Sequence, residues 1–104
     1  MPAYVITDVK VSDPQRYQAY TAISPQAVAA AGGRFLARGG RARQLEGERT
    51  PGRVVVVEFP TYEAACAFYE SALYRQARAT RAGATERFEM VVVDGVPSGT
   101  APPA

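Results

Sequence analysis

The sequence contains no histidine, and this absence removes the commonest general base and the commonest transition-metal ligand of proteins. A haem held by an axial histidine is excluded, and a zinc site would have to rest on carboxylates because only one cysteine is present. We therefore expect no metal and no cofactor. Any catalysis would have to use Tyr, Asp, Glu, Lys, Arg, Ser, Thr or the single thiol of Cys66.

Disulfides, long apolar runs and strong net charge are also absent. Cys66 has no partner for a disulfide within one chain, which is typical of a reducing compartment. No run of 18 apolar residues occurs, and the first residues lead directly into an alternating strand pattern. The net charge is +2, and the only basic cluster is the short run RGGRAR at residues 38–43. We expect a cytoplasmic protein that binds neither membranes nor nucleic acids.

The length of 104 residues fits one domain, which we assign to residues 1–96. Residues 97–104 contain too much proline, glycine and serine to pack, so we expect a disordered tail there. Within the domain, apolar patterns of strand type predict four strands, at residues 3–11, 34–45, 53–60 and 87–95.

Two helical patterns separate these strands. The first begins at a capping box formed by Ser12 and Gln15, and it contains Pro25, which should kink or split the helix. The second begins at the capping residue Thr61 and ends at Gly83. The resulting order predicts an α+β, ferredoxin-like βαββαβ fold, with a four-stranded antiparallel sheet and two helices on one face.

Alternation divides the predicted sheet into two faces, and both carry apolar side chains. In the strand at residues 53–60, Val55, Val57 and Phe59 share one face, which we assign to the helices. The other face would expose an apolar patch that is large for a monomer, comprising Tyr4, Ile6, Val54 and Val56. We therefore expect a homodimer that pairs these faces.

Several segments together resemble the bacterial family known as domain of unknown function 1330, in the dimeric α+β barrel superfamily. They are AYVITDVKVSDPQRYQAY, AAAGGRFLARGG, LEGERTPGRVVVVEFPTYEAACAFYESALYRQA and MVVVDGV, and they cover roughly residues 3–96. The resemblance implies a ferredoxin-like protomer whose sheet packs against that of a second copy to form a dimeric barrel. More distant relatives include cofactor-free monooxygenases, muconolactone isomerases and haem enzymes, and the haem branches would need the missing histidine. Ala72-Leu73 departs from the family pattern and should make the second helix more regular.

Arg38 is the first candidate for a functional residue, because Gly39 and Gly40 leave space beside it. One hypothesis is an anion clamp that binds a carboxylate or enolate. The alternative is a strand bulge that brings Arg38 into a buried ion pair with Glu58. Glu58 itself is either that partner or a carboxylate whose raised pKa suits proton abstraction. Asp8 is a possible second carboxylate in the same space.

Tyr20 and Tyr74 are the best candidates among the helical tyrosines for contact with a ligand, because both lie near helix ends or kinks. Helical tyrosines are more often part of the core. Cys66 is most simply a small buried apolar residue.

Three classes of function remain open. The protein is a cofactor-free enzyme of the isomerase, cyclase, hydrolase or oxygenase type acting on an aromatic or lactone-like anion, a ligand-binding dimer without chemistry, or a purely structural dimer. Tyrosines with an arginine favour a planar anionic ligand.

Overall fold

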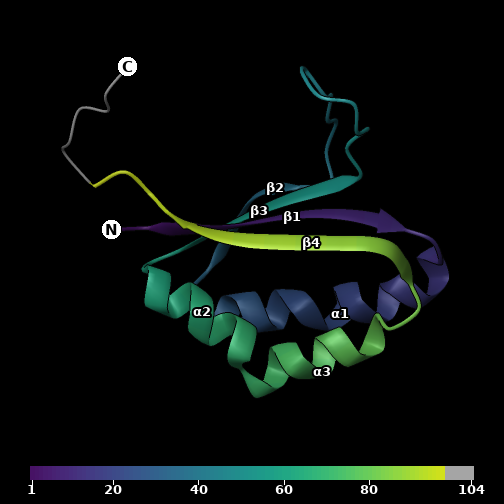
Figure 1. Cartoon of the computed structure of the whole chain (residues 1–104). Coiled ribbons are helices and arrows are strands. Elements are labelled where there is room, and N and C mark those ends of the chain that lie inside the picture. Colours follow the sequence, from purple (N-terminus) through teal and green to yellow (C-terminus); the bar gives the residue numbers. More distant parts are fainter. Residues whose placement is uncertain (98–104) are drawn as a thin grey trace.

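The sheet is built around the first strand, β1 (Ala3–Val11), in the computed structural model, which describes residues 1–97. The remaining elements follow as α1 (Pro14–Ala30), β2 (Arg34–Arg38), β3 (Arg53–Phe59), α2 (Tyr62–Glu70), α3 (Ala72–Thr80) and β4 (Thr85–Asp94). The strand order is β2-β3-β1-β4, and all pairs are antiparallel. The helices cover one face of the sheet and leave the other open (Figure 1). The ferredoxin-like prediction is confirmed. The tail predicted for residues 97–104 lies, from residue 98 onward, outside the described residues.

The core lies between the sheet and the helices, as the alternation of side chains predicts. Val5 pairs with Val57 on one side and with Val92 on the other, so three strands contribute to one apolar layer. The open face carries exposed apolar side chains in the isolated chain: Ile6 (38%), Leu36 (48%), Val91 (56%) and Val93 (46%). Among residues 1–97, no helix is long and apolar enough to cross a membrane.

Helix α1 starts one residue later than the capping box predicts. The Asp13 carboxylate, not the Ser12 hydroxyl, accepts a hydrogen bond from the Arg16 N–H at 3.1 Å. Pro14 occupies the first turn, where its missing N–H leaves no helical bond unmade. The helix continues through Pro25 to Ala30, so the expected split does not occur.

The second predicted helix is broken at Ser71, which corrects the expectation of a more regular helix there. Ser71 has an extended backbone (φ −64°, ψ 151°) that ends α2 and begins α3. Its hydroxyl donates to the Phe68 carbonyl at 2.7 Å and accepts from the Tyr74 N–H at 3.1 Å. These two bonds stabilise the break, because they satisfy backbone groups that a helix end otherwise leaves unpaired. Tyr74, in the first turn of α3, is completely buried.

Strand β2 contains a bulge and is shorter than predicted. Phe35 pairs with Val57 and Arg38 with Val55, so Leu36 and Ala37 together oppose Val56. The extra residue reverses the alternation, and Arg38 therefore lies on the helix-covered face. The strand ends at Gly39, whose φ of +69° turns the chain into a loop. This loop projects away from the helices before β3 begins (Figure 1).

Candidate functional site

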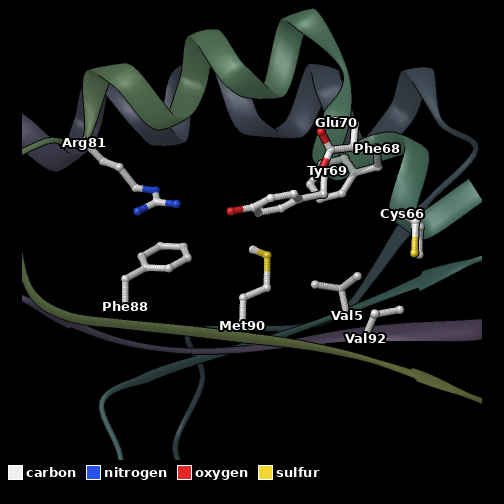
Figure 2. A pocket seen from close by; sticks show the side chains of 10 residues that line it. Val5, Cys66, Phe68, Tyr69, Glu70, Arg81, Phe88, Met90 and Val92 are labelled. Atoms are coloured by element: carbon white, nitrogen blue, oxygen red, sulfur yellow. The ribbon is translucent and has the colours of Figure 1, made fainter.

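A cavity of about 520 Å³ lies between the helices α2 and α3 and the inner face of the sheet. Its floor comes from alternate residues of β4 and from β1, and its roof from the end of α2. Figure 2 shows that the two ends of the cavity differ in polarity. Arg81 and the hydroxyl of Tyr69 lie toward one end, and Met90 lies in the middle. The other end is formed mainly by the apolar residues Val5, Val92, Phe68 and Cys66, with Glu70 beside Phe68.

Arg81 is the charged group that faces this cavity from its polar end. It caps the C-terminus of α3, and its guanidinium carbon lies 3.6 Å from the ring centroid of Phe88. A second ring, that of Tyr20, lies 5.5 Å away. The Arg81 Nε is buried and has no hydrogen-bond partner among residues 1–97. Stacking fixes the guanidinium plane without satisfying its N–H groups. Arg81 also lowers the pKa of Tyr74 through its charge and a side-chain hydrogen bond, and its remaining N–H groups are donors for an anion.

Tyr20, whose ring lies near Arg81, is hydrogen-bonded to Tyr74, with 2.7 Å between their hydroxyl oxygens. Burial raises the pKa of both phenols. The neighbouring Tyr74 raises the pKa of Tyr20 further. For Tyr74, the hydrogen bond to Tyr20 and the nearby Arg81 offset part of the rise in pKa. Both tyrosines are therefore neutral hydrogen-bonding groups at physiological pH. Neither lines the large cavity, although Tyr20 lines a smaller one.

Two further polar groups lie at the rim of the large cavity. The Tyr69 hydroxyl accepts a hydrogen bond from Arg78 Nη1 at 2.8 Å, and the same guanidinium stacks on the Tyr69 ring at 4.3 Å. Glu70 is exposed and forms an ion pair with Arg75 at 3.2 Å. Glu70 is thus a carboxylate that solvent and a bound ligand could both reach.

The predicted pair of Arg38 and Glu58 is wrong. Glu58 lies on the open face, where its carboxylate accepts from Arg34 Nε at 2.9 Å. Arg38 lies on the opposite face and stacks over the ring of Phe35 at 4.4 Å. The bulge at residues 36 and 37 is the physical cause, because one extra residue exchanges the faces of all residues that follow it in the strand.

Asp8 also lies on the open face, but it is not close to Glu58. Asp8 pairs with Val54 in the sheet, whereas Glu58 pairs with Tyr4 nearer the other end of β3. The Asp8 carboxylate accepts from Arg87 at 2.7 Å and from the Gly52 N–H at 3.0 Å. Burial alone would raise the pKa of Asp8, but the bonds to Arg87 and Gly52 and the charges of Arg87 and Arg49 lower it overall. Asp8 is therefore an ionised structural partner.

Sequence analysis missed Arg81 and the inner residues of β4. The signal for β4 was present, because Phe88, Met90 and Val92 alternate along the last strand. No comparable signal separates Arg81 from Arg75 and Arg78, which precede it at the same spacing. Among residues 1–97, no cluster of three or more His, Cys, Asp or Glu side chains could hold a metal.

Three solved structures show how widely this fold occurs. A protein of unknown function from Rhodopseudomonas palustris is 20% identical, with a TM-score of 0.72 over 92% of this chain and 83% of its own. A dimeric ferredoxin-like protein of unknown function from Thermobifida fusca is 17% identical, with a TM-score of 0.60 over 89% and 90%. A Nitrosomonas europaea protein, provisionally described as an antibiotic biosynthesis monooxygenase, is 20% identical, with a TM-score of 0.57 over 96% and 94%. Likeness at this identity shows the fold alone.

None of the functionally curated proteins matches the chain. The sequence pattern of a family described as domain of unknown function (DUF1330) matches residues 2–96, nearly the whole chain. The chain belongs to the DUF1330 family.

Proposed function

We propose that the protein binds a small amphipathic anion in the cavity beneath α2 and α3. The apolar body of the ligand lies against Val5, Met90 and Val92, and its anionic group accepts hydrogen bonds from Arg81. The observation that carries this proposal is Arg81 itself, a guanidinium that is stacked in place with a buried, unpartnered Nε among the described residues.

The size and lining of the cavity support a ligand of this class. Ligand sites usually have volumes of about 300 to 1,000 Å³ and combine apolar walls with a few polar groups. The cavity measures about 520 Å³ and has one guanidinium at one end. A planar aromatic or lactone-like acid fits both properties, since aromatic rings surround the guanidinium and its fork matches a carboxylate.

The test is a thermal-shift and calorimetric comparison of aromatic acids with their uncharged amides. Benzoate, phenylacetate and 1-naphthoate should stabilise the protein, whereas the corresponding amides should not. A ligand at 100 times its Kd raises the free energy of unfolding by about 2.7 kcal/mol. Arg81→Met should weaken acid binding at least tenfold, and Arg81→Lys should recover only part of the loss, because an ammonium cannot replace the planar fork.

Arg43→Met is the matched control, since it removes the same charge from the exposed loop between β2 and β3. Equal binding of acids and amides, or undiminished binding by a folded Arg81→Met variant, would refute the proposal.

The second candidate function is a cofactor-free reaction of the isomerase, cyclase, hydrolase or oxygenase type on the same ligand. Glu70 favours it, because this carboxylate lies at the rim of the cavity and no other carboxylate of residues 1–97 lines it. The Nitrosomonas protein with the same fold is provisionally described as a monooxygenase. Once a bound acid is known, conversion that is lost in Glu70→Gln while binding persists would support this candidate, and an unchanged ligand would exclude it.

We also propose that two copies pair the open faces of their sheets to form a dimeric α+β barrel. The exposed apolar residues of that face support this arrangement, and relatives with the same fold are described as dimeric. Ion pairs at the margins of the patch, including Arg34 with Glu58, leave its centre apolar. Sedimentation at micromolar concentration should show twice the monomer mass of 11.1 kDa.

A further inference from the structure

Gly39 leaves space for the side chain of Arg53. A Cβ added to Gly39 would lie 2.5 Å from Arg53 Nη1 and 3.0 Å from its guanidinium carbon, too close for either atom. Arg53 opens β3 and shares its inner face with Val55, so its guanidinium lies on the helix-covered side beside the end of β2. The glycine thus allows a second guanidinium to lie next to the backbone of Arg38.

The bulge in β2 places Arg38 on the same helix-covered side, so Arg38 and Arg53 lie in one corner of the inner face, where β2 ends and β3 begins. Its guanidinium stacks over Phe35 at 4.4 Å, which fixes the plane of the fork but leaves the N–H groups available. Within residues 1–97, neither Arg38 nor Arg53 forms an ion pair. The adjacent helix α1 and strand β2 contain no acidic residue that could neutralise them.

Both arginines line a cavity of about 40 Å³ whose other polar lining residues carry hydroxyls. These are Tyr17, Tyr20, Thr21 and Ser24 of α1 and Thr7 of β1. The hydroxyl of Tyr20 is paired with that of Tyr74, and the hydroxyl of Thr21 donates to the Gln18 carbonyl. Burial raises the pKa of Tyr17, and the charge of Arg53 and a side-chain hydrogen bond from it oppose this rise, so part of the Arg53 guanidinium is engaged by this hydroxyl. Arg81 does not line this cavity, and the two arginines do not line the large one.

We propose that this corner is a second anion site, in which Arg38 and Arg53 bind a phosphate group at the mouth of the hydroxyl-lined cavity. Two guanidiniums that line the same cavity and form no ion pair among residues 1–97 repel each other, and a dianion bound between them would be attracted by both. Guanidinium forks and hydroxyls together offer more donors than a carboxylate can accept, which favours the several oxygens of phosphate. The cavity behind the arginines is large enough for an oxygen or a water molecule but too small for an organic group.

The proposal is tested with inorganic phosphate, added at constant ionic strength with chloride as the balancing anion. Side-chain Nε–Hε signals of Arg38 and Arg53 should shift in NMR spectra, and calorimetry should give a saturable isotherm. Arg38→Met and Arg53→Met should each weaken phosphate binding at least tenfold. If Arg53→Met fails to fold, Arg53→Lys replaces it in the test. Arg53→Lys should still weaken phosphate binding, because it keeps the positive charge but removes the planar guanidinium.

The control variant Arg43→Met separates this site from general charge effects and should bind phosphate as the unmodified protein does. Shifts of the Nε–Hε signals at Arg38 and Arg53, followed residue by residue, separate this site from the large cavity. Phenyl phosphate, followed by the Nε–Hε signals of Arg38 and Arg53, tests whether the site takes a phosphomonoester. Shifts at these signals like those caused by phosphate indicate a phosphorylated ligand, and shifts with phosphate alone indicate the free ion; either supports the site. No saturable phosphate binding, equal affinity for acetate, or equal weakening in Arg43→Met would overturn it. None of these results depends on whether aromatic acids bind at Arg81.

Discussion

Gly39 and Gly40 are neighbours in the chain, but only the first requires the properties of glycine. Gly39 has a φ of +69°, and its missing Cβ leaves room for the Arg53 guanidinium. Gly40 has no neighbouring atom within 4 Å of an added Cβ, and its φ is not in the left-handed region. Sequence analysis correctly indicated a need for backbone space here, but it assigned that space to Arg38 and a ligand.

Gly39→Ala should therefore destabilise the protein, while Gly40→Ala should not. The left-handed backbone costs about 1 to 2 kcal/mol for a residue with a Cβ, and displacement of Arg53 adds to this. Gly40→Ala should be neutral or should stabilise by up to about 1 kcal/mol, because it restricts the unfolded chain. Urea denaturation of the two variants measures the difference, and equal stabilities would show that the turn tolerates a side chain.

The buried tyrosine pair makes stability depend on pH in the alkaline range. Burial raises the pKa of Tyr20 and Tyr74, so the native state keeps protons that the unfolded chain loses near pH 10. The unfolded state then binds fewer protons, and the free energy of unfolding must fall as the pH rises above that value. Each tyrosine contributes at most about 1.4 kcal/mol per pH unit to this slope.

We expect denaturation midpoints that are constant from about pH 7 to 9 and decrease between about pH 10 and 11. Tyr74→Phe should make the decrease shallower, because it removes one of the three buried tyrosines with a raised pKa, which are Tyr17, Tyr20 and Tyr74. Tyr62→Phe is the control, since Tyr62 is exposed and its substitution should leave the profile unchanged. A Tyr74→Phe profile parallel to that of the unmodified protein would contradict this explanation.

At the scale of elements, the strands and their order follow from the sequence, but the position of the bulge in β2 does not: it was expected at Gly39 and Gly40 and lies at Leu36 and Ala37. Alternating valines reveal β1 and β3 because burial on one face or both imposes a period that can be read directly. A bulge inserts one residue without any change in composition, and its position depends on how β2 pairs with β3. This single residue reversed the predicted face of Arg38 and therefore its predicted partner.

The break between α2 and α3 was missed for a related reason. Neither proline nor glycine marks it, and the local sequence Glu70-Ser71-Ala72 is compatible with a continuous helix. The break depends on the Ser71 hydroxyl, which bonds to both helices, and on burial of Tyr74 beneath them. Tertiary packing therefore determines that the helix is interrupted at Ser71, which helix propensity alone does not predict.

Ser71→Ala should lower the free energy of unfolding by about 1 kcal/mol, the usual effect of losing a helix N-cap. Ser12→Ala is the matched control, because Ser12 also precedes a helix while Asp13 provides the cap there. We expect a change within about 0.5 kcal/mol for the control. Chemical denaturation measures both, and an equal loss in the two variants would show that the Ser71 hydroxyl is not what stabilises the break.

At the scale of the whole molecule, the open face of the sheet is the main feature that a single chain leaves unexplained. Its central residues Ile6, Val56 and Val91 pair across three adjacent strands, and Ile6 and Val91 are exposed in the isolated chain. A contiguous apolar surface of this kind usually marks an interface. Ile6 and Val56 were predicted on this face from the sequence, because alternation assigns faces wherever no bulge intervenes, whereas Val91 was not named.

Val91→Lys should convert the proposed dimer into a folded monomer. The new ammonium is solvated in the monomer, but pairing of the open faces would bury two of them without partners, at a cost of several kcal/mol. Ala67→Lys adds the same charge on the exposed side of α2 and should leave the dimer intact. Sedimentation velocity at micromolar concentration distinguishes the outcomes, and a dimeric Val91→Lys variant would place the interface elsewhere.

The central position of β1 also governs how the domain folds. Its two neighbours are β3 and β4. The sheet is therefore complete only after β4, the last strand in the chain, has paired with β1, the first. Such distant pairings make folding slower than for helical bundles of similar size.

The same topology holds the two ends of the domain together, since the Gly95 N–H donates to the Pro2 carbonyl at 2.8 Å. A circular permutant that joins these ends and opens the chain in the loop between β2 and β3 should thus keep the sheet while β3 becomes the first strand to be synthesised.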